Sequence, residues 1–215
     1  MDNNKEAVDV FDKYAEPYHD KFRNHSSYLA TYEGFARLIS AAGLDTGRTL
    51  DAACGSGIFS GFLLHRFPSL KITGIDLAPN MIRLARQNCP GAEFSVMDCR
   101  EIGSLDTPFD IILLGFCLPY LSRSEAWSLL TDAASIMTPG GLLYLSTMTG
   151  DYTSSGYQNP GDRDRIFTYY HEKKVLLEQL ESSGFNLVNV ETKPFTNGDG
   201  TQVDDLFVFA RKSGG

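Results

Sequence analysis

The segment Asp51-Ala52-Ala53-Cys54-Gly55-Ser56-Gly57 joins a predicted strand to a predicted helix, and this junction decides the fold. The strand covers residues 49–53, and from about residue 58 the apolar side chains recur with the spacing of a helix. Gly55 and Gly57 permit a turn in which a ligand can approach the backbone closely. The helix that follows presents N–H groups without intrahelical partners. The segment therefore predicts a ligand-binding loop.

Two further acids follow the strands that come next in the chain. Asp76 ends the second predicted strand, about 20 residues after Gly57, which is the separation at which dinucleotide-binding folds place a carboxylate on a ribose diol. Asp98 stands at the end of the third predicted strand. Because ligands of open α/β sheets bind at the carboxyl ends of the strands, we expect Asp51, Asp76 and Asp98 to gather around one site.

Short β-type runs alternate with helical patterns along the chain, which predicts one α/β domain over residues 1–215. The later strands are predicted at residues 71–75, 93–96, 110–114, 142–147, 185–190 and 206–210, and the other helices at residues 8–18, 27–42, 80–88, 125–137 and 172–182. Turn residues 197–200 separate the last two strands, which favours an antiparallel hairpin at the sheet edge. The predicted fold class is α/β, a Rossmann-like doubly wound sheet of seven strands, mostly parallel, with an antiparallel C-terminal hairpin and N-terminal helices.

Two segments outside this alternation are candidates for contact with a substrate. Residues 149–164 are polar, contain several glycines and serines, and are too long for an ordinary connection. We expect residues 150–170 to form a substrate loop and residues 1–45 to form a helical cap. Arg163 and Arg165 in the loop could bind an anionic group, or form a solvated charge pattern with the neighbouring aspartates.

The composition narrows the class of partner. The 215 residues include 19 Lys and Arg against 27 Asp and Glu, a net charge of −8, which disfavours binding to nucleic acid. The longest apolar run, residues 111–121, is far shorter than the roughly 20 residues that cross a bilayer. We therefore expect a cytoplasmic monomer or homodimer with a small-molecule substrate and without a nucleic-acid or membrane partner.

The four cysteines, Cys54, Cys89, Cys99 and Cys117, are far apart and form no C-x-x-C pair. Their spacing indicates neither a zinc site nor a disulfide framework. We predict reduced, buried thiols and no metal site.

The chain resembles the class I S-adenosylmethionine-dependent methyltransferases, a seven-strand superfamily, and in particular its small-molecule members. The resemblance covers residues 49–211 and rests on the acid-x-x-x-G-x-G loop, the acids after strands two and three, and a Pro-Gly-Gly turn at residues 139–141. It implies S-adenosylmethionine as the cofactor. The cofactor-binding residues that it implies are Asp51, Ala53, Gly55, Gly57, Asp76, Leu77, Met81, Asp98, Cys99, Gly115 and Phe116.

The resemblance also implies a role for several of these residues. The Gly55 backbone and the Asp51 region would hold the methionyl part of the cofactor, and Asp76 would bind both ribose hydroxyls. A carboxylate is suited to this because it accepts two hydrogen bonds at once. Met81 would pack on the adenine, whose edge Asp98 and Cys99 would meet.

Residues 11–19 resemble the aromatic N-terminal segment that many small-molecule members fold over the cofactor. We predict that Tyr14, and with less weight Tyr18, contacts the cofactor through its hydroxyl or its ring. The alternative is that both tyrosines only pack a helix against the sheet.

The reaction implied by the resemblance is transfer of a methyl group to oxygen or nitrogen of a small molecule by in-line displacement. Proximity and orientation can supply much of its acceleration, so no general base is required. Candidates for a base are Tyr120, Tyr170, His171 and His19. His171 precedes a predicted helix, which favours a capping role or a surface position.

Other functions stay open. A non-catalytic regulatory protein that binds S-adenosylmethionine or S-adenosylhomocysteine would carry the same loop and acids. An NAD(P)-dependent short-chain dehydrogenase has a similar loop, and Tyr169 with Lys173 imitates its Tyr/Lys pair; however, its glycine strand begins near residue 1, and here it begins near residue 49. Residues 115–120 lack the acid-Pro-Pro-Tyr motif of nucleobase methylation, and Cys117 is expected to be a small residue of the pocket wall.

Overall fold

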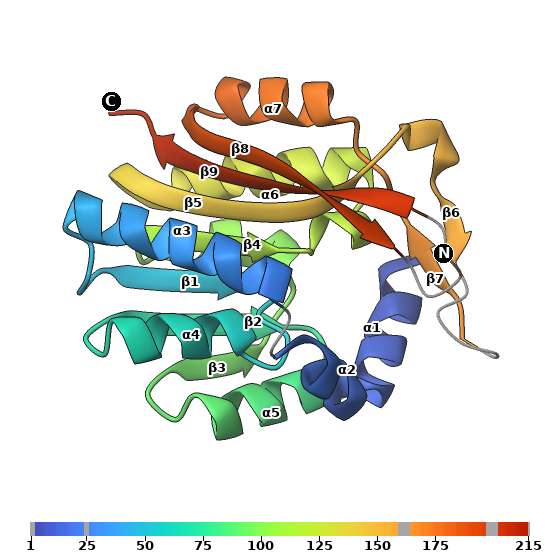
Figure 1. Ribbon diagram of the computed structural model, residues 1–215, viewed down its shortest axis with the longest axis horizontal. Coiled ribbons are helices and arrows are strands. Elements are labelled where there is room, and N and C mark those ends of the chain that lie inside the picture. Colours follow the sequence, from blue (N-terminus) through green and yellow to red (C-terminus); the bar gives the residue numbers. More distant parts are fainter. Residues whose placement is uncertain (1–2, 24–25, 159–163, 197–201, 215) are drawn as a thin grey trace.

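A seven-stranded sheet forms the centre of the computed structural model (Figure 1), with the strand order β3-β2-β1-β4-β5-β9-β8. The structure describes residues 3–23, 26–158, 164–196 and 202–214. The strands of this sheet are β1 (Arg48–Ala52), β2 (Lys71–Asp76), β3 (Glu93–Val96), β4 (Phe109–Gly115), β5 (Met137–Thr149), β8 (Phe185–Thr196) and β9 (Gln202–Lys212). Strands β1 to β5 pair in parallel, whereas β9 is antiparallel to both β5 and β8. The predicted fold class is confirmed.

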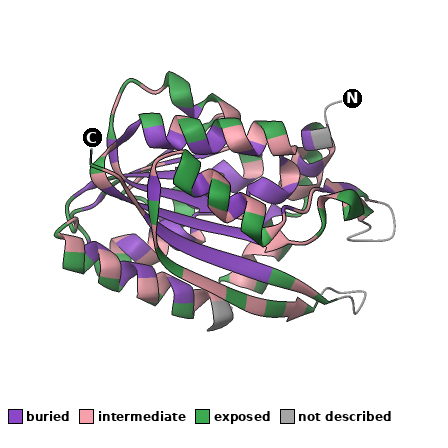
Figure 2. Cartoon of the chain, turned by 90° about the horizontal axis from the view of Figure 1, so that it is seen from above, coloured by how far each residue is buried: buried purple, intermediate pink, exposed green. Residues whose placement is uncertain are grey.

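Helices cover both faces of the sheet (Figures 1 and 2). The α-helices are α1 (Asn3–Lys13), α2 (Ala15–Phe22), α3 (Ser26–Ala42), α4 (Ile58–Arg66), α5 (Pro79–Asn88), α6 (Arg123–Ser135) and α7 (Lys173–Ser182). Ile111 and Leu113 of β4 pack with α3 and α4, whereas Ile112 and Leu114 pack with α6 and α7. This alternation follows from the two-residue period of a strand, and it explains why β4 is apolar on both faces.

The N-terminal residues predicted as one helix form two helices, α1 and α2, which meet at Tyr14. Pro17 explains the break, because a residue without an N–H ends the hydrogen-bond ladder of α1 and is tolerated in the first turn of α2. The two helices lie at the carboxyl ends of the parallel strands (Figure 1). Asp12 fixes α1 to α5 by accepting the backbone N–H of Asn80 at 2.6 Å.

Other boundaries also differ from the sequence prediction. Strand β5 begins at Met137, and the Pro-Gly-Gly residues lie inside it as an irregularity, because Met137 pairs with Phe109 but Leu142 with Ile111. Strands β8 and β9 extend well beyond the predicted hairpin, and its predicted turn, residues 197–200, lies outside the described residues.

The described part of the predicted substrate loop, residues 150–158 and 164–170, contains regular secondary structure. It contains a short 3-10 helix, η3 (Tyr152–Ser154), and a small antiparallel pair, β6 (Gly156–Gln158) with β7 (Ile166–Thr168). Two further 3-10 helices, η1 (Cys99–Ser104) and η2 (Leu118–Tyr120), follow β3 and β4. Among the described residues, no helix combines the length and the apolar character that crossing a membrane requires.

Candidate functional site

Two neighbouring cavities lie at the carboxyl ends of β1, β2 and β4. The first, here called the Asp76 cavity, has a volume of about 110 Å³, and the second, the Asp51 cavity, of about 80 Å³. Both are lined by Tyr18, Ala53, Gly55, Gly115 and Phe116. Their combined volume is below the ~300 Å³ at which small-molecule clefts begin. Phe11 of α1 and Tyr18 of α2 contribute to the cavity walls, so these two helices cover the strand ends.

The backbone between the two cavities is strained. Gly55 and Gly57 have φ values of +52° and +77°, in the left-handed region that glycine adopts without penalty. Ala53 and Phe116 are the non-glycine residues with positive φ among those that the structure describes, at 66° and 53°. Both line both cavities, and strained backbone of this kind concentrates at functional sites.

Asp76 stands in the wall of the Asp76 cavity with a fixed carboxylate. One oxygen accepts the backbone N–H of Gly55 and the other that of Ala78, both at 2.9 Å. Burial raises the pKa of this carboxyl, and the two N–H groups act in the opposite direction. Each oxygen can accept a further hydrogen bond, so the carboxylate can receive two hydroxyl donors from one ligand.

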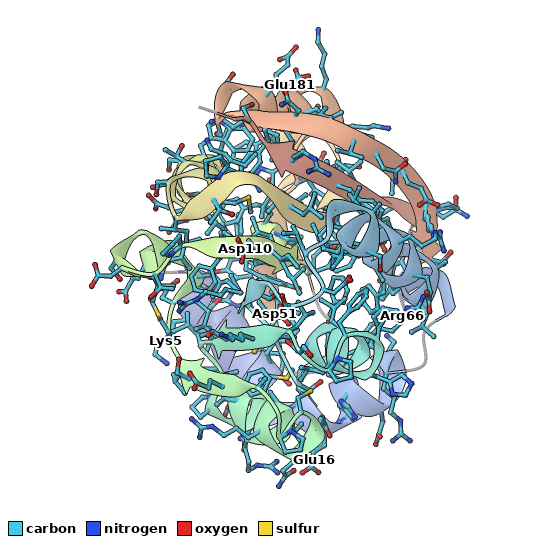
Figure 3. The ribbon with its side chains drawn as sticks, turned by 90° about the vertical axis from the view of Figure 1, so that its left-hand side faces the viewer. Lys5, Glu16, Asp51, Arg66, Asp110 and Glu181 are labelled. Carbon is cyan, nitrogen blue, oxygen red and sulfur yellow. The ribbon has the colours of Figure 1, made fainter. Side chains whose placement is uncertain are left out.

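Asp51 lies in the interior of the molecule, as Figure 3 shows, and lines the Asp51 cavity. Burial raises the pKa of its carboxyl to about 6, and the nearby Asp76 acts in the same direction. The Ser60 hydroxyl donates to Asp51 at 2.6 Å and stabilises the charged form. This end of the site therefore carries a buried carboxylate that favours a cation or a hydrogen-bond donor.

Asp98 departs from the expected arrangement. Its carboxylate caps η1 by accepting the Arg100 backbone N–H at 2.9 Å, and it binds the Arg100 guanidinium at 2.6 Å. Arg100 also pairs with Glu125 at 2.7 Å, which fixes it against α6. Asp98 does not line the Asp76 cavity, whereas its neighbour Cys99 does.

Of the two N-terminal tyrosines, Tyr18 and not Tyr14 lines the cavities, whereas the prediction placed more weight on Tyr14. Tyr14 is 40% exposed and lines neither cavity, and its hydroxyl donates to Asp164 at 2.6 Å. The helix break at Tyr14 turns this side chain outward. Tyr18 lines both cavities, and burial raises its pKa to about 12.

The candidates for a catalytic base are dispersed. Tyr120 lines the Asp76 cavity, and burial raises its pKa far above the ordinary value. His19 belongs to α2 and contacts the glycine loop, with its Nδ1 2.9 Å from the Ser56 hydroxyl oxygen. It lines neither cavity. Tyr170 packs on Gly150 and also lies outside both walls.

The structure contradicts the prediction that His171 caps a helix or lies at the surface. His171 is fully buried, with Nε2 3.1 Å from the Leu118 carbonyl oxygen and its ring 5.7 Å from that of Trp127. The chain before α7 contacts η2, because the backbone N–H of Tyr169 donates to the Pro119 carbonyl at 2.7 Å, and the imidazole lies against Leu118 rather than in water. Burial lowers its pKa below 6.5. His171 therefore joins the substrate loop to η2.

This burial has a consequence for stability. Because the pKa of His171 is lower in the folded protein than in the unfolded chain, the unfolded chain binds more protons just below pH 6.5. The free energy of unfolding should therefore fall as the pH falls below 6.5. His171→Gln removes this contribution, and we expect a smaller difference in stability between pH 7.5 and 5.5 in urea unfolding. His65→Gln, at an exposed histidine, is the control and should retain the wild-type difference. Equal differences in all three proteins would contradict the prediction.

Most of the predicted cofactor residues meet at the cavities. Those that line one or both are Asp51, Ala53, Gly55, Asp76, Leu77, Met81, Cys99, Gly115 and Phe116. Gly57 shapes the loop, whereas Tyr14 and Asp98 lie outside. Cys117 lines the wall as predicted, and all four cysteines are buried free thiols.

The sequence predicted a helical cap over residues 1–45, but the side chains of α1 that line the cavity were not named as site residues. These side chains, which line the Asp76 cavity, are Asn4, Ala7, Val8 and Phe11. Their spacing of three, one and three residues is one face of a helix, so the signal was present in the sequence. Tyr28 of α3, which lines the Asp51 cavity, was also missed as a site residue.

Comparison with known proteins gives several methyltransferases among its matches. Residues 49–141 match a family model described as a methyltransferase domain. Malonyl-[acyl-carrier protein] O-methyltransferase of Methylococcus capsulatus is 24% identical over 157 residues, 70% of this chain and 56% of that protein. The chain spans between 35% and 56% of the length of three curated relatives that it matches.

Solved structures agree with this match. A TehB-like SAM-dependent methyltransferase from Corynebacterium glutamicum is 25% identical with a TM-score of 0.65, over 94% of this chain and 99% of that one. Magnesium protoporphyrin IX methyltransferase from Synechocystis, solved with bound SAM, is 17% identical with a TM-score of 0.70, over 99% and 98%. At 17% identity, the similarity to the Synechocystis protein is evidence for a shared fold alone.

The strand order and the acid at the end of β2 define a doubly wound α/β domain with a ligand site at its strand ends. With the methyltransferase-domain model that matches residues 49–141, they make the chain similar to the class I S-adenosylmethionine-dependent methyltransferases.

Proposed function

We propose that the chain binds S-adenosylmethionine across the two cavities and transfers its methyl group to oxygen or nitrogen of a small molecule by in-line displacement. The observation that carries the proposal is the Asp76 carboxylate, which is held by two backbone N–H groups and can receive both hydroxyls of a ribose. The glycine loop supports it, since a Cβ at Gly115 would meet nothing within 4 Å and a Cβ at Gly55 only the Met81 sulfur at 4.0 Å. A ligand can therefore lie against the backbone there.

The residues divide the cofactor between the cavities. Asp76 would bind the ribose, and Met81 and Cys99 would flank the adenine in the mainly apolar Asp76 cavity. Asp51 would face the methionyl end in the second cavity. When bound, the cofactor supplies an electrophilic methyl group on a positively charged sulfur. The chain would orient the acceptor, exclude water through α1 and α2, and favour positive charge through its buried carboxylates.

The first test is calorimetry of the purified protein with S-adenosylhomocysteine and S-adenosylmethionine. We expect dissociation constants in the micromolar range and no binding of NAD⁺, because the described residues that line the two cavities include no Lys, Arg or His to bind a pyrophosphate. Absence of heat with both sulfur ligands up to millimolar concentration would refute the proposal. If they bind, methyl-labelled cofactor with small-molecule extracts separates catalysis from regulatory binding, since only an enzyme yields labelled product.

A further inference from the structure

Helix α1 has one face toward the Asp76 cavity and lies beside β7 (Figure 1). Ala7, Val8 and Phe11 belong to the face that lines the cavity. Glu6 and Lys13 are two helical turns apart, so they share a face of α1, and the helical period places this face opposite the cavity-lining residues. The helix therefore has an inner face over the site and an outer face with charged side chains.

Two residues that precede β7 bind this outer face. Lys13 donates to Asp164, with Nζ 2.8 Å from Oδ2, and the Tyr14 hydroxyl donates to the same oxygen at 2.6 Å. Arg165 forms an ion pair with Glu6, with Nη2 3.3 Å from Oε1. Asp164 and Arg165 are here called the β7 latch. The latch thus connects the predicted substrate loop to both ends of α1.

The β7 latch is itself attached to the body of the domain. Arg165 lies over the Tyr157 ring of β6, with its guanidinium carbon 4.3 Å from the ring centroid. Tyr157 is paired with Phe167 between β6 and β7. Just after β7, the backbone N–H of Tyr169 donates to the Pro119 carbonyl oxygen of η2 at 2.7 Å. The latch can therefore hold α1 in place rather than move with it.

The contact of α1 with α5 is of a different kind. The Asp12 carboxylate accepts the backbone N–H of Asn80 at 2.6 Å and its side-chain amide at 3.0 Å. Ala78 is the N-cap of α5 and provides no side-chain cap, so Asp12 satisfies an N–H group at the start of that helix. In the latch, by contrast, the side chains of Lys13 and Arg165 are 55% and 58% exposed. Exposed ion pairs contribute little to stability, so the β7 side of α1 opens more easily than the α5 side.

Entry of a cofactor into the site requires α1 to move. The two cavities together are smaller than the ~300 Å³ at which small-molecule clefts begin. Phe11 of α1 contacts two other residues of the wall, with its ring 5.0 Å from that of Tyr120 and 5.7 Å from that of Tyr18. A nucleoside that enters the Asp76 cavity must displace this ring, and with it the helix that carries it.

We propose that the β7 latch sets the rate at which the cofactor enters and leaves, by holding α1 over the Asp76 cavity while Asp12 keeps the helix attached to α5. The inference rests on the proposed function and adds a control of the same site. Asp164 and Arg165 are positioning residues, because they contact α1 and line neither cavity. A latch that holds α1 equally in the empty and the loaded protein changes both rates together and leaves the affinity almost unchanged.

The experiment measures the association and dissociation of S-adenosylhomocysteine by surface plasmon resonance, with the full chain immobilised. Asp164→Ala removes one ion pair and one hydrogen bond of the latch. We therefore expect both rate constants to rise about 3- to 10-fold, while the dissociation constant stays within about 2-fold of wild type. Tyr14→Phe removes the hydrogen bond alone and should raise both rate constants by a smaller factor.

Asp9→Ala is the matched control, because Asp9 is an exposed acid that pairs with Lys5 within α1 itself at 2.8 Å. Its rate constants should equal those of wild type, and thermal unfolding confirms that each variant is folded. Hydrogen exchange without ligand gives a second readout, since the amides of α1 should exchange faster in Asp164→Ala and those of α5 should not.

Three results would overturn the inference. These are rate constants of Asp164→Ala equal to those of wild type, a rise in dissociation alone with a loss of affinity, and unchanged hydrogen exchange in α1. Failure of S-adenosylhomocysteine to bind wild-type protein would instead overturn the proposed function. Faster exchange of α1 in Asp164→Ala would then still support the part of the inference that concerns the hold of the latch on this helix.

Discussion

Asp76→Ala should lower the affinity for S-adenosylhomocysteine by at least about 100-fold, because two hydrogen bonds to a charged group are lost at ~1.5–3 kcal/mol each. No other described acid in the wall of the Asp76 cavity can replace it. The backbone N–H groups of Gly55 and Ala78 lose their acceptor at the same time, so the loop geometry is weakened as well. Calorimetry measures the effect.

Two variants make this result specific. Asp76→Asn keeps the shape of the side chain, but an NH₂ group, which donates hydrogen bonds, replaces one of the two accepting oxygens. We therefore expect its affinity for S-adenosylhomocysteine to lie between those of wild type and Asp76→Ala. Asp45→Ala removes an exposed acid before β1, at the other end of the sheet, and should bind as wild type. Affinity within about 3-fold of wild type in a folded Asp76→Ala protein would refute the ribose assignment, since one charged hydrogen bond alone exceeds that factor.

The sequence was sufficient for the sheet and for the residues on its strand ends. Backbone direction alone brings Asp51 and Asp76 to one edge, because both lie at or near the carboxyl ends of parallel strands that are neighbours in the sheet. Asp98 shows the limit of this reasoning. Its position was predicted correctly, but the direction of its carboxylate depends on Arg100, two residues later, and on Glu125, which is distant in sequence.

The same limit applies to residues whose roles depend on tertiary packing. His171 is buried in contact with Leu118 of η2, and the local pattern of residues gave no sign of that contact. Tyr28 and Asp205 are 177 residues apart, and only the return of β9 beside β5 brings them together. Periodicity predicts which elements form, whereas the partners of a polar side chain follow from the packing of those elements.

Gly74→Ala should destabilise the fold strongly. Gly74 lies in β2, and a Cβ there would be 2.4 Å from two ring carbons of Phe94 and 3.2 Å from the Cys54 sulfur. Phe94 is buried, so its ring has no solvent-side space into which to move. Overpacking of this kind costs ~1–3 kcal/mol or more, and in a chain of this size each kcal/mol lowers the melting temperature by ~2–4 °C.

Gly115→Ala is the matched control for this prediction, because a Cβ at Gly115 meets nothing within 4 Å. Because the added methyl group makes no close contact, the melting temperature of Gly115→Ala should stay within about 2 °C of the wild-type value. Since Gly115 lines both cavities, the added methyl group should lower the affinity for S-adenosylhomocysteine, measured by calorimetry. The two glycines would thus separate a requirement of the fold from a requirement of the site.

The cause of the Gly74 effect can be isolated with a second change. Phe94→Ala alone loses a buried ring and should destabilise by ~3–5 kcal/mol, but it also removes the atoms that the new Cβ would meet. In urea unfolding, the Gly74→Ala/Phe94→Ala double variant should therefore be more stable than the sum of the two single changes predicts. Strict additivity would mean that Gly74 is required for backbone conformation rather than for the close approach of the Phe94 ring, and the packing explanation would be wrong.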